Sequence, residues 1–550
     1  GSTTLASIAG VNYGASTFKT VAGVNSLNIN PTYITGTNLH IQMPCNNGAN
    51  LGVAKDIDGD IRSTSPDIGA DEMTNIASND IGVMKINSPS IPYAPGTQTI
   101  NVTLRNLGAN TVTTASVNYR LNGGSVVTET WSGVLNSCDT ANFTFTTTST
   151  FPIGSNNLIT YTSSPNGTTD ANNSNDTAQW TICTGMMGAY TINPTGSGPT
   201  NFTTFTAAAN ALGCGGVYGP VTITVAANTY IEQVSIPFIA GASAINTVTF
   251  EGFNAATRII AFAPTAALPY VLRFNTCNYV TFRNFTIRGT GATTTWVTHF
   301  LDGTNNRVSK CIIDFTGTGV TSTATTFVPI VVNGHPTTIN GSTLVARNHM
   351  VDSSSIYYGY YGAYTSLTTD SCKFYLLSNN FIGVYQYGYY AVNGAFSPRI
   401  NYNTFNMRSG VTGSTTNQGI FIQSCSNTGS NYMDVSANKV LNPGQYGIQL
   451  SSCTNSGTAF NLVNNNMIGG GFTNLSTTSG IYFTTVSRTL LYHNSVNMDA
   501  ATSGGINAAI YINAGSGNDI RNNNLMISNA SALSAFPIYL SATSVITTLD

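Results

Sequence analysis

The sequence has little charge: only 7% of its 550 residues are Asp, Glu, Lys or Arg, against about 25% in an average protein. The net charge is −2 and Lys and Arg form no run, so no nucleic-acid partner is expected. No apolar run approaches the roughly 20 residues of a membrane-spanning helix. The nine cysteines include no CxxC pair and no Cys/His pair at zinc-ligand spacing, which leaves buried thiols or a few disulfides.

Gly, Asn, Ser and Thr take the place of the missing charge, together with 41% apolar residues and 10% aromatics. That apolar fraction is too large for a disordered chain. Hydroxyl and carboxamide side chains compete for backbone groups, and Thr is β-branched, so the composition favours strands, turns and stacked hydrogen bonds over helices. We therefore expect an all-β protein of two or three domains.

Short alternating strands separated by turns extend over residues 79–183. Apolar and polar residues alternate over residues 117–121 and again over the stretch that ends at Trp131, and the turn residues Asn122-Gly123-Gly124 separate the two stretches. This pattern is typical of a β-hairpin. Six or seven such strands predict a β-sandwich. Three stretches stand out in it: NDIGV (79–83), VTLRNLGAN (102–110) and NNSNDTAQW (172–180). They resemble the cell-adhesion-related immunoglobulin-like domain of bacterial surface proteins.

A repeat dominates residues 190–550. After a helix expected near 201–212, a small residue opens an alternating strand every 26 to 33 residues, at Gly362, Gly388, Gly419, Gly447, Gly480, Ala509 and Pro537. A turn that contains Asn follows each of the first six of these strands. Coils of this length, with Asn amides stacked every 4.8 Å or so, predict a parallel β-helix whose first coil the helix caps.

Two stretches resemble known β-helix segments. GPVTITVAANTYIEQVSI (219–236) resembles the opening coil of right-handed parallel β-helices, and DIDGDIRSTSPDIGADE (56–72) resembles the closing signature of many secreted bacterial β-helix proteins. These likenesses place the chain with secreted right-handed parallel β-helix (pectin-lyase-like) surface proteins of type IX secreting bacteria. They imply a β-helix C-terminal-type cap segment at 1–73, an immunoglobulin-like sandwich at 79–183 and a β-helix at 190–550.

A cap at the front of the chain needs something to cover. The last strand, within residues 536–550, leaves the growing edge of the solenoid unpaired, and buried backbone groups without partners cost about 1–3 kcal/mol each. We therefore expect residues 1–73 to close a β-helix end head to tail. The end would belong to another copy, to a neighbouring domain of a longer chain or to the same chain.

Two sets of polar residues suggest ligands or modification. Asp56, Asp58 and Asp60 alternate around a glycine, as in loops whose carboxylates bind Ca²⁺, so calcium is the one candidate cofactor. Thr140 and Thr177 each stand in an Asp-Thr-Ala triplet. These triplets resemble the O-glycosylation acceptors of type IX secreting bacteria.

Cys425 and Cys453 each stand six residues after a rung-opening glycine. They should therefore stack on neighbouring coils, about 4.8 Å apart, which is within reach of a disulfide. A Cys425–Cys453 disulfide and a ladder of two buried thiols are both consistent with this spacing.

Tyrosines are concentrated in residues 357–390. Aromatic rings stack on sugars, which makes six of them glycan-binding candidates: Tyr357, Tyr358, Tyr360, Tyr361, Tyr385 and Tyr387. Stacking between coils would explain the same residues without any ligand.

Glycan chemistry would need clustered carboxylates. The acids after residue 201 are scattered, and folding would have to assemble sets such as Asp434 with Lys439 and Arg408, or Asp370 with Lys373. No catalytic residue is predicted. The main hypothesis is a non-enzymatic structural or adhesive protein at the cell surface, a segment or subunit of a filament or other large assembly. The alternatives are a polysaccharide lyase or hydrolase of the β-helix class, and a surface protein that binds glycans through its Tyr-rich face.

Overall fold

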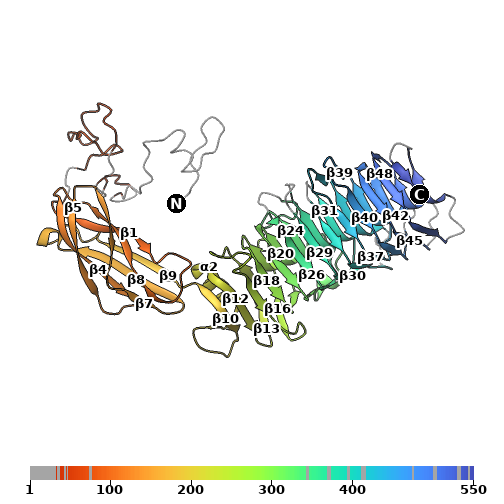
Figure 1. Cartoon of the computed structure of the whole chain (residues 1–550), viewed down its shortest axis with the longest axis horizontal. Helices are drawn as coiled ribbons and strands as arrows, with labels where there is room; N and C mark the ends of the chain where they lie inside the picture. Colours follow the sequence, from red (N-terminus) through yellow and green to blue (C-terminus); the bar gives the residue numbers. More distant parts are fainter. Residues whose placement is uncertain are drawn as a thin grey trace. The chain divides into compact units, whose positions relative to one another are not determined.

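The computed structural model describes residues 33, 37–41, 45, 48–73, 77–341, 346–367, 373–392, 397–410, 416–473, 476–499, 505–528, 534–542 and 546–550. The chain forms two compact units. The first comprises Gly1–Ile91 and Pro95–Thr184, and the second comprises Pro92–Ala94 and Gly185–Asp550. Figure 1 shows the first unit in red to orange and the second in yellow to blue.

The first unit contains antiparallel sheets. A three-stranded sheet has the order β1 (Ile81–Ser88), β3 (Asn101–Asn106), β6 (Thr140–Thr144), and a four-stranded sheet has the order β5 (Val127–Leu135), β4 (Val112–Leu121), β8 (Ser155–Ser163), β9 (Thr177–Cys183). A short pair joins β2 (Gly96–Gln98) to β7 (Ser149–Phe151), and η1 (Pro165–Gly167) precedes β9. Alternate side chains such as Val102, Leu104 and Val117 are fully buried, as half-buried strands require.

Residues before 77 contribute only isolated bridges where they are described, Tyr33 to Ile41 and Lys55 to Ile61. This segment is joined to the sandwich strands covalently, because Cys45 and Cys138 form a disulfide across 93 residues. The guanidinium of Arg105 on β3 adds a hydrogen bond to the Cys45 carbonyl, 3.2 Å away.

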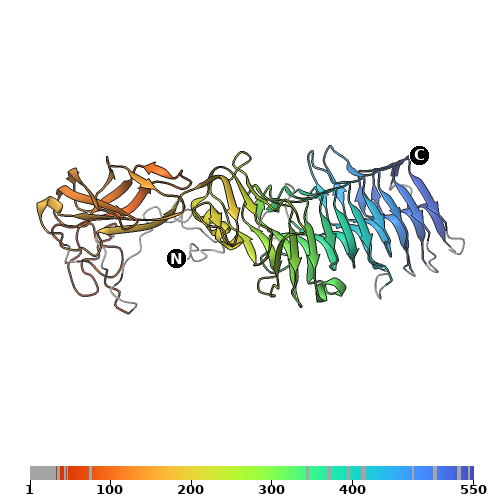
Figure 2. The same cartoon turned by 90° about the horizontal axis from the view of Figure 1, so that it is seen from below.

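The second unit is a right-handed parallel β-helix with three long parallel sheets (Figure 2). The first sheet runs β11 (Asn201–Phe202), β10 (Met186–Ile192), β12 (Val217–Val225), β15 (Val248–Glu251), β18 (Val280–Arg283), β22 (Arg307–Ser309), β26 (His349–Asp352), β29 (Phe374–Leu377), β32 (Arg399–Asn401), β36 (Asp434–Ser436), β40 (Asn461–Asn464), β44 (Thr489–Tyr492), β48 (Asn518–Arg521), β51 (Ile546–Leu549).

The second sheet runs β13 (Asn228–Ile231), β16 (Arg258–Phe262), β19 (Thr286–Gly289), β23 (Ile312–Phe315), β27 (Ser355–Tyr357), β30 (Asn380–Val384), β33 (Thr404–Met407), β37 (Lys439–Leu441), β41 (Met467–Gly469), β45 (Ser495–Met498), β49 (Asn524–Ile527). The third runs β14 (Val234–Ile236), β17 (Tyr270–Asn275), β20 (Thr295–Leu301), β24 (Phe327–Asn333), β28 (Tyr361–Ser366), β31 (Tyr387–Val392), β34 (Gln418–Gln423), β38 (Tyr446–Ser451), β42 (Thr478–Thr484), β46 (Asn507–Ile512), β50 (Ala535–Leu540).

The connections between the long sheets contain α3 (Thr318–Thr321) and three short parallel pairs of strands. These pairs are β21 (Gly303–Thr304) with β25 (Ala346–Arg347), β35 (Ser426–Asn427) with β39 (Thr454–Asn455), and β43 (Val486–Ser487) with β47 (Gly515–Ser516).

One helix covers the first coils. α2 (Phe205–Gly215) buries Phe205, Ala208, Ala209 and Leu212 against the solenoid core. It begins later than the sequence suggests, because Asn201 and Phe202 belong to β11 and Thr204 is the N-cap that accepts from the Ala207 N–H.

An asparagine ladder connects the first and second sheets. The side-chain Nδ2 of each member donates to the Oδ1 of the next at 3.0 or 3.1 Å, in the order Asn379, Asn403, Asn438, Asn466, Asn494, Asn523. The residue before each member has left-handed backbone, with φ from 55° to 61°: Ser378, Tyr402, Ala437, Asn465, His493 and Asn522. The repeated turn therefore fixes each amide in the stacked geometry that the sequence predicts.

Candidate glycan-binding face

Aromatic side chains line up on the outer surface of the third sheet. Strand pairing sets Tyr361 of β28 opposite Tyr387 of β31, and sets Tyr364 opposite Tyr390, which is opposite Phe421 of β34. Ala363 and Tyr389, which directly precede Tyr364 and Tyr390, belong to the solenoid core, because neighbouring side chains on a strand point to opposite faces. Tyr361, Tyr364, Tyr387, Tyr390 and Phe421 are called the aromatic face below.

The rings of the aromatic face pack closely on one another. Tyr361 and Tyr387 are stacked with centroids 5.7 Å apart, and Tyr390 and Phe421 are stacked at 5.1 Å. Tyr361 also lies 5.3 Å from both Tyr364 and Tyr390. Tyr364 is buried, whereas the other four are half-buried and keep part of each ring open to solvent. Interstrand packing thus accounts for part of this cluster, and an open aromatic surface remains.

A polar pocket opens beside these rings. It has a volume of about 290 Å³ and is lined by Asn340, Tyr361, Tyr364, Tyr390, Val392, Gln423 and Ser424. The hydroxyl of Tyr390 donates to Gln423 Oε1 at 3.3 Å, and the hydroxyl of Tyr364 donates to Asn340 Oδ1. Burial raises the pKa of Tyr390 to about 12, so its hydroxyl stays protonated and able to donate at neutral pH. Aromatic rings flanked by amides and hydroxyls offer both the stacking surface and the hydrogen bonds that a sugar ring uses.

The column of outer residues continues along the sheet. From Phe421 the register passes through Gln449 to Tyr482, Tyr511 and Tyr539. Neighbouring rings in this second part are 4.9 and 5.0 Å apart. The column of outer aromatic rings therefore continues along the solenoid axis, with Tyr482 and Tyr539 half-buried and Tyr511 buried.

The six tyrosines suggested by the sequence are spread over several elements. Tyr361 and Tyr387 belong to the aromatic face. Tyr357 ends β27 of the second sheet, and Tyr358, Tyr360 and Tyr385 lie in the turns between the second and third sheets. The sequence reasoning did not select Tyr364, Tyr390, Phe421, Asn340 or Gln423. The coil spacing, which sets Tyr364, Tyr390 and Phe421 at equivalent places in successive coils, was the signal that could have identified the first three.

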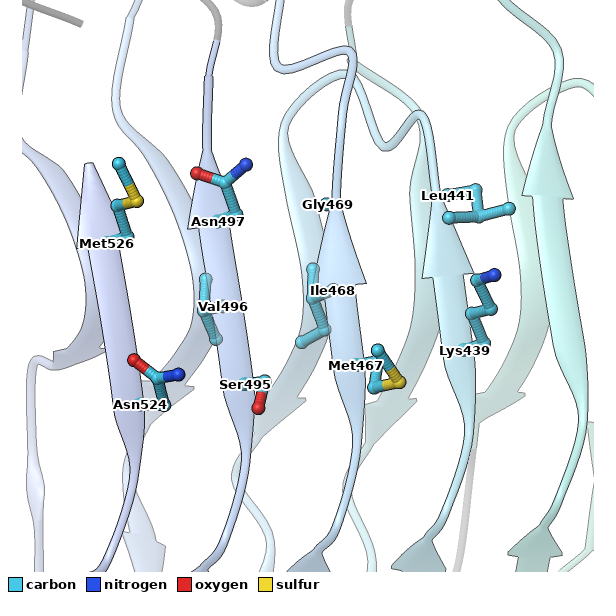
Figure 3. A pocket seen from close by; sticks show the side chains of 10 residues that line it. All are labelled: Lys439, Leu441, Met467, Ile468, Gly469, Ser495, Val496, Asn497, Asn524 and Met526. Carbon is cyan, nitrogen blue, oxygen red and sulfur yellow. The ribbon is translucent and has the colours of Figure 1, made fainter. Parts of the chain in front are cut away.

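A second depression lies on the second sheet (Figure 3). It has a volume of about 370 Å³, and its lining residues are Lys439, Leu441, Met467, Ile468, Gly469, Ser495, Val496, Asn497, Asn524 and Met526. Gly469 has no side chain to fill the space between Leu441 and Asn497, which leaves a shallow groove. Lys439 is the one charged residue in this lining, so the groove itself contains no acid and base pair.

Several carboxylates of the solenoid form structural ion pairs. Asp352 binds Arg307 through two bonds of 2.6 and 2.8 Å, and Asp314 binds Arg288 in the same way at 2.8 and 2.6 Å. Glu251 pairs with an arginine of the next coil. Bidentate pairs of this kind hold neighbouring coils in register.

The first acidic set considered from sequence, Asp434 with Lys439 and Arg408, is not assembled. Asp434 lies on the first sheet and accepts from Ser436, Lys439 lies on the second sheet, and Arg408 donates to the carbonyls of Gly383 and Val320. The set of Asp370 with Lys373 lies partly outside the described residues, because Asp370 is not among them.

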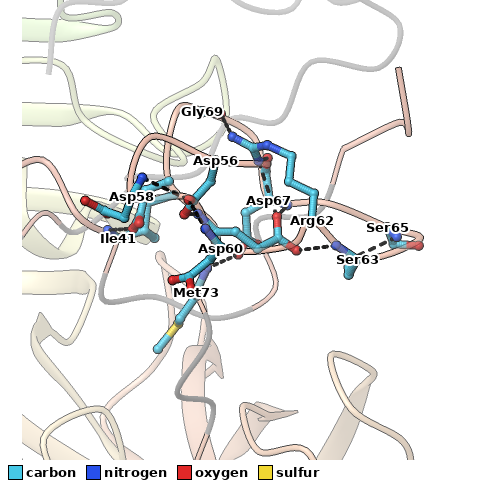
Figure 4. A network of polar contacts seen from close by, with 12 residues as sticks. Ile41, Asp56, Asp58, Asp60, Arg62, Ser63, Ser65, Asp67, Gly69 and Met73 are labelled. Atoms are coloured by element: carbon cyan, nitrogen blue, oxygen red, sulfur yellow. Dashed lines mark hydrogen bonds and ion pairs between the residues drawn. The ribbon is translucent and has the colours of Figure 1, made fainter. Parts of the chain in front are cut away.

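Asp56 and Asp58, two of the three proposed calcium ligands in the first unit, have separate partners (Figure 4). The Asp56 carboxylate accepts the backbone N–H groups of Glu72, Asp60 and Asp58 at 3.0, 2.8 and 2.9 Å, which lowers the pKa of Asp56. Asp58 instead lies 2.7 Å from His40 Nε2 and raises the pKa of that histidine. Asp56 is therefore the centre of a loop network, and calcium at Asp56, Asp58 and Asp60 stays a prediction.

One of the two predictions for the cysteine pair, the disulfide, is wrong. Cys425 and Cys453 do stack, because the Thr454 N–H donates to the Cys425 carbonyl at 2.9 Å, but both residues are buried thiols and no disulfide joins them. The Cys453 sulfur is directed at the carbonyls of Ile422 and Ser451, each 3.4 Å away. The thiol ladder, the other reading of the spacing, is what the structure contains.

The two predicted O-glycosylation sites are exposed. Thr140 opens β6 and Thr177 opens β9. Their aspartates differ, because Asp139 is exposed whereas Asp176 is buried. Glycosylation at either threonine stays a prediction.

The fold defines the class of protein as a right-handed parallel β-helix, and comparison with known proteins agrees with that class. No family model matches the chain. No curated protein matches it. Among solved structures, the family 28 exopolygalacturonase of Yersinia enterocolitica is 8% identical, with 83% of this chain and 99% of that chain covered and a TM-score of 0.35.

Two further solved structures are similar to parts of the chain. The catalytic domain of a GH87 α-1,3-glucanase is 8% identical over 86% of this chain and 100% of that chain, with a TM-score of 0.34. The CARDB domain of the PF1109 protein from Pyrococcus furiosus, in complex with di-metal ions, is 20% identical over 20% of this chain and 97% of that chain, with a TM-score of 0.17.

These comparisons correct the main functional hypothesis. The prediction of a non-enzymatic structural or adhesive protein is wrong as the first reading, because the neighbours of the solenoid include polysaccharide-degrading enzymes. Contacts with further copies of the chain stay a prediction.

Proposed function

We propose that the chain binds a polysaccharide along the aromatic face of the third sheet. The observation that carries this proposal is the combination of half-buried rings in register, Tyr361, Tyr387, Tyr390 and Phe421, with a pocket whose polar groups include Asn340 and Gln423. Rings supply stacking contacts with sugars, and the amides supply directional hydrogen bonds.

Secretion of the protein is consistent with this proposal, because a secreted protein can reach polysaccharides outside the cell. Within the part of the chain that the structure describes, no helix combines the length and the apolar character needed to cross a membrane. The resemblance of the sequence to surface proteins of type IX secreting bacteria supports an extracellular location. We propose in addition that the first unit is an immunoglobulin-like domain.

Binding is tested with a glycan array followed by titration calorimetry on the glycan that binds best. The Tyr390→Ala variant should weaken binding about three- to tenfold, since an aromatic contact contributes about 0.5–1.5 kcal/mol. Tyr390→Phe, which keeps the ring, should lose less. Tyr402→Ala is the matched control, because Tyr402 is an exposed tyrosine in a turn outside the third sheet. Equal affinities for Tyr390→Ala and the parent would refute the proposed face.

Polysaccharide hydrolysis is the second candidate, favoured by the exopolygalacturonase and the α-1,3-glucanase among the structural neighbours. Polygalacturonate and α-1,3-glucan are accordingly the first substrates to assay, with release of reducing ends as the readout. Hydrolysis requires two carboxyl groups about 5 to 9.5 Å apart across the scissile bond. A protein that binds a glycan without releasing reducing ends from it would leave the binding proposal intact and reject hydrolysis.

A further inference from the structure

Three carboxyl groups converge at one end of the antiparallel sheets of the first unit. Asp80 immediately precedes β1, and Asp170 and Asp176 lie in the connection from η1 to β9. One oxygen from each lies within 4.8 Å of the others. The exposed fractions of the three residues are 2%, 7% and 5%. Acids almost never reach this degree of burial without a partner.

The hydrogen bonds available do not satisfy these carboxylates. Asp170 accepts from the backbone N–H groups of Ile81 at 3.2 Å and Asn172 at 3.0 Å, and Asp80 Oδ2 accepts from Asn175 Nδ2 at 3.0 Å. Three buried oxygens have no hydrogen-bond partner: Asp80 Oδ1, Asp176 Oδ1 and Asn175 Oδ1. The cluster therefore presents acceptors in excess of donors.

The charge of the cluster is also uncompensated by protein groups. None of the ion pairs found among the described residues includes Asp80, Asp170 or Asp176. Buried carboxylates this close together repel one another unless a cation balances their charge.

The backbone around the cluster is held in place independently of any ligand. The Asp176 carbonyl accepts from Val83 and Thr162, and the Asp80 carbonyl accepts from Leu107. A Cβ at Gly82 would lie 2.5 Å from the Asn175 carbonyl oxygen, so β1 and the loop approach as closely as a glycine permits. The ligand atoms are thus preorganised.

We propose that this cluster binds a calcium ion through the carboxylates of Asp80, Asp170 and Asp176 and the side-chain oxygen of Asn175. Oxygen ligands alone, most of them anionic, match the preference of Ca²⁺, which accepts six to eight oxygens in flexible geometry. Mg²⁺ fits less well, because it retains several waters and this site is buried. The bound ion would join the start of β1, in the three-stranded sheet, to the loop before β9, in the four-stranded sheet.

The test uses the full chain after removal of metal with EDTA. Titration calorimetry with CaCl₂ should show binding, and the melting temperature should rise in calcium relative to EDTA. Asp176→Asn should lose the binding at this site and the calcium-dependent rise. Asp139→Asn is the matched control, since Asp139 begins the other Asp-Thr-Ala triplet and is exposed, and this variant should behave as the parent does.

A second variant separates this site from His40, Asp58 and Asp71, which also converge. Asp58→Asn should retain the binding that Asp176→Asn loses. Terbium luminescence on the unmodified chain, displaced by CaCl₂, keeps the proposal testable if Asp176→Asn does not fold, and failure of terbium to bind would overturn it. Unchanged melting with EDTA and no binding heat would overturn it as well. An equal response to MgCl₂ at equal concentration would overturn the assignment to calcium.

Discussion

Arg273 donates its Nε–H to the Nδ1 of buried His299, 3.0 Å away, and the Nε2 of His299 lies 2.8 Å from Asn333 Oδ1. The imidazole is therefore neutral, with its proton on Nε2. Burial, and then the positive charge of Arg273, lower the pKa of His299 to about 3. The unfolded chain would bind a proton there below about pH 6.5, whereas the folded chain would not until about pH 3.

The solenoid should therefore lose stability as the pH falls from about 6.5 toward 3. The loss from this residue approaches about 1.4 kcal/mol per pH unit, because the unfolded state binds one more proton than the native state. Urea denaturation at pH 7, 6 and 5 measures it. His299→Gln should reduce this dependence but not abolish it, because burial also lowers the pKa of His349 to about 3, whereas a substitution at exposed His493 should leave it as in the parent. Identical slopes for His299→Gln and the parent would contradict the assignment.

The asparagine ladder should carry a large share of local stability. Asn438 accepts from the Asn403 backbone and side chain and donates to Ile400 and Asn466. Asn438→Ala leaves several buried groups unpaired, at about 1–3 kcal/mol each. A drop of at least about 2 kcal/mol in the free energy of unfolding is expected.

The control for the ladder is Asn524→Ala, which removes an exposed amide from β49. Its stability should stay within about 0.5 kcal/mol of the parent. Similar losses of unfolding free energy for Asn438→Ala and Asn524→Ala would contradict a particular contribution of the ladder to stability.

The rung-opening glycines should tolerate no side chain. A Cβ at Gly447 would lie 2.4 Å from Ile468 Cγ2 and 2.6 Å from the Gly480 carbonyl oxygen. Gly447→Ala should therefore destabilise the protein by about 1–3 kcal/mol through overpacking. Gly469→Ala is the comparison, because its nearest atom would be 3.6 Å away, and its melting temperature should be close to that of the parent.

The buried cysteines should resist alkylation in the native protein. Cys277, Cys311, Cys425 and Cys453 are buried thiols, and burial raises the pKa of Cys311 and Cys453 to about 12. Since the thiolate is the reactive form, iodoacetamide should modify these four only after unfolding. Peptide mass spectrometry checks this, and a peptide cross-linked between Cys425 and Cys453 would contradict it.

Much of the solenoid could be read from sequence because its determinants are local and repeated. Gly447 and Asn438 recur at equivalent places in neighbouring coils, and each reports a steric or hydrogen-bonding requirement of one turn. The coils before Gly362 show no such pattern, because their third-sheet strands, such as β20 and β24, begin with Thr295 and Phe327 in place of a small residue.

The sites were less predictable because they depend on contacts between distant residues. Asp80 and Asp176 are separated by nearly the whole sandwich region, and only antiparallel pairing brings them together. The Cys45–Cys138 disulfide spans 93 residues for the same reason. On the third sheet, composition identified many tyrosines, but strand parity decides that Tyr390 faces outward while Tyr389 is fully buried in the core.

Within the asparagine ladder, each inner member bonds to one member before it and one member after it, and Asn438 and Asn466 are 28 residues apart. Duplication of one complete coil would insert a further asparagine that meets both neighbours, whereas insertion of half a coil would leave two amides facing the wrong side chains. The length of this protein can accordingly change in whole coils by tandem duplication, with the capping helix and the antiparallel unit unaffected.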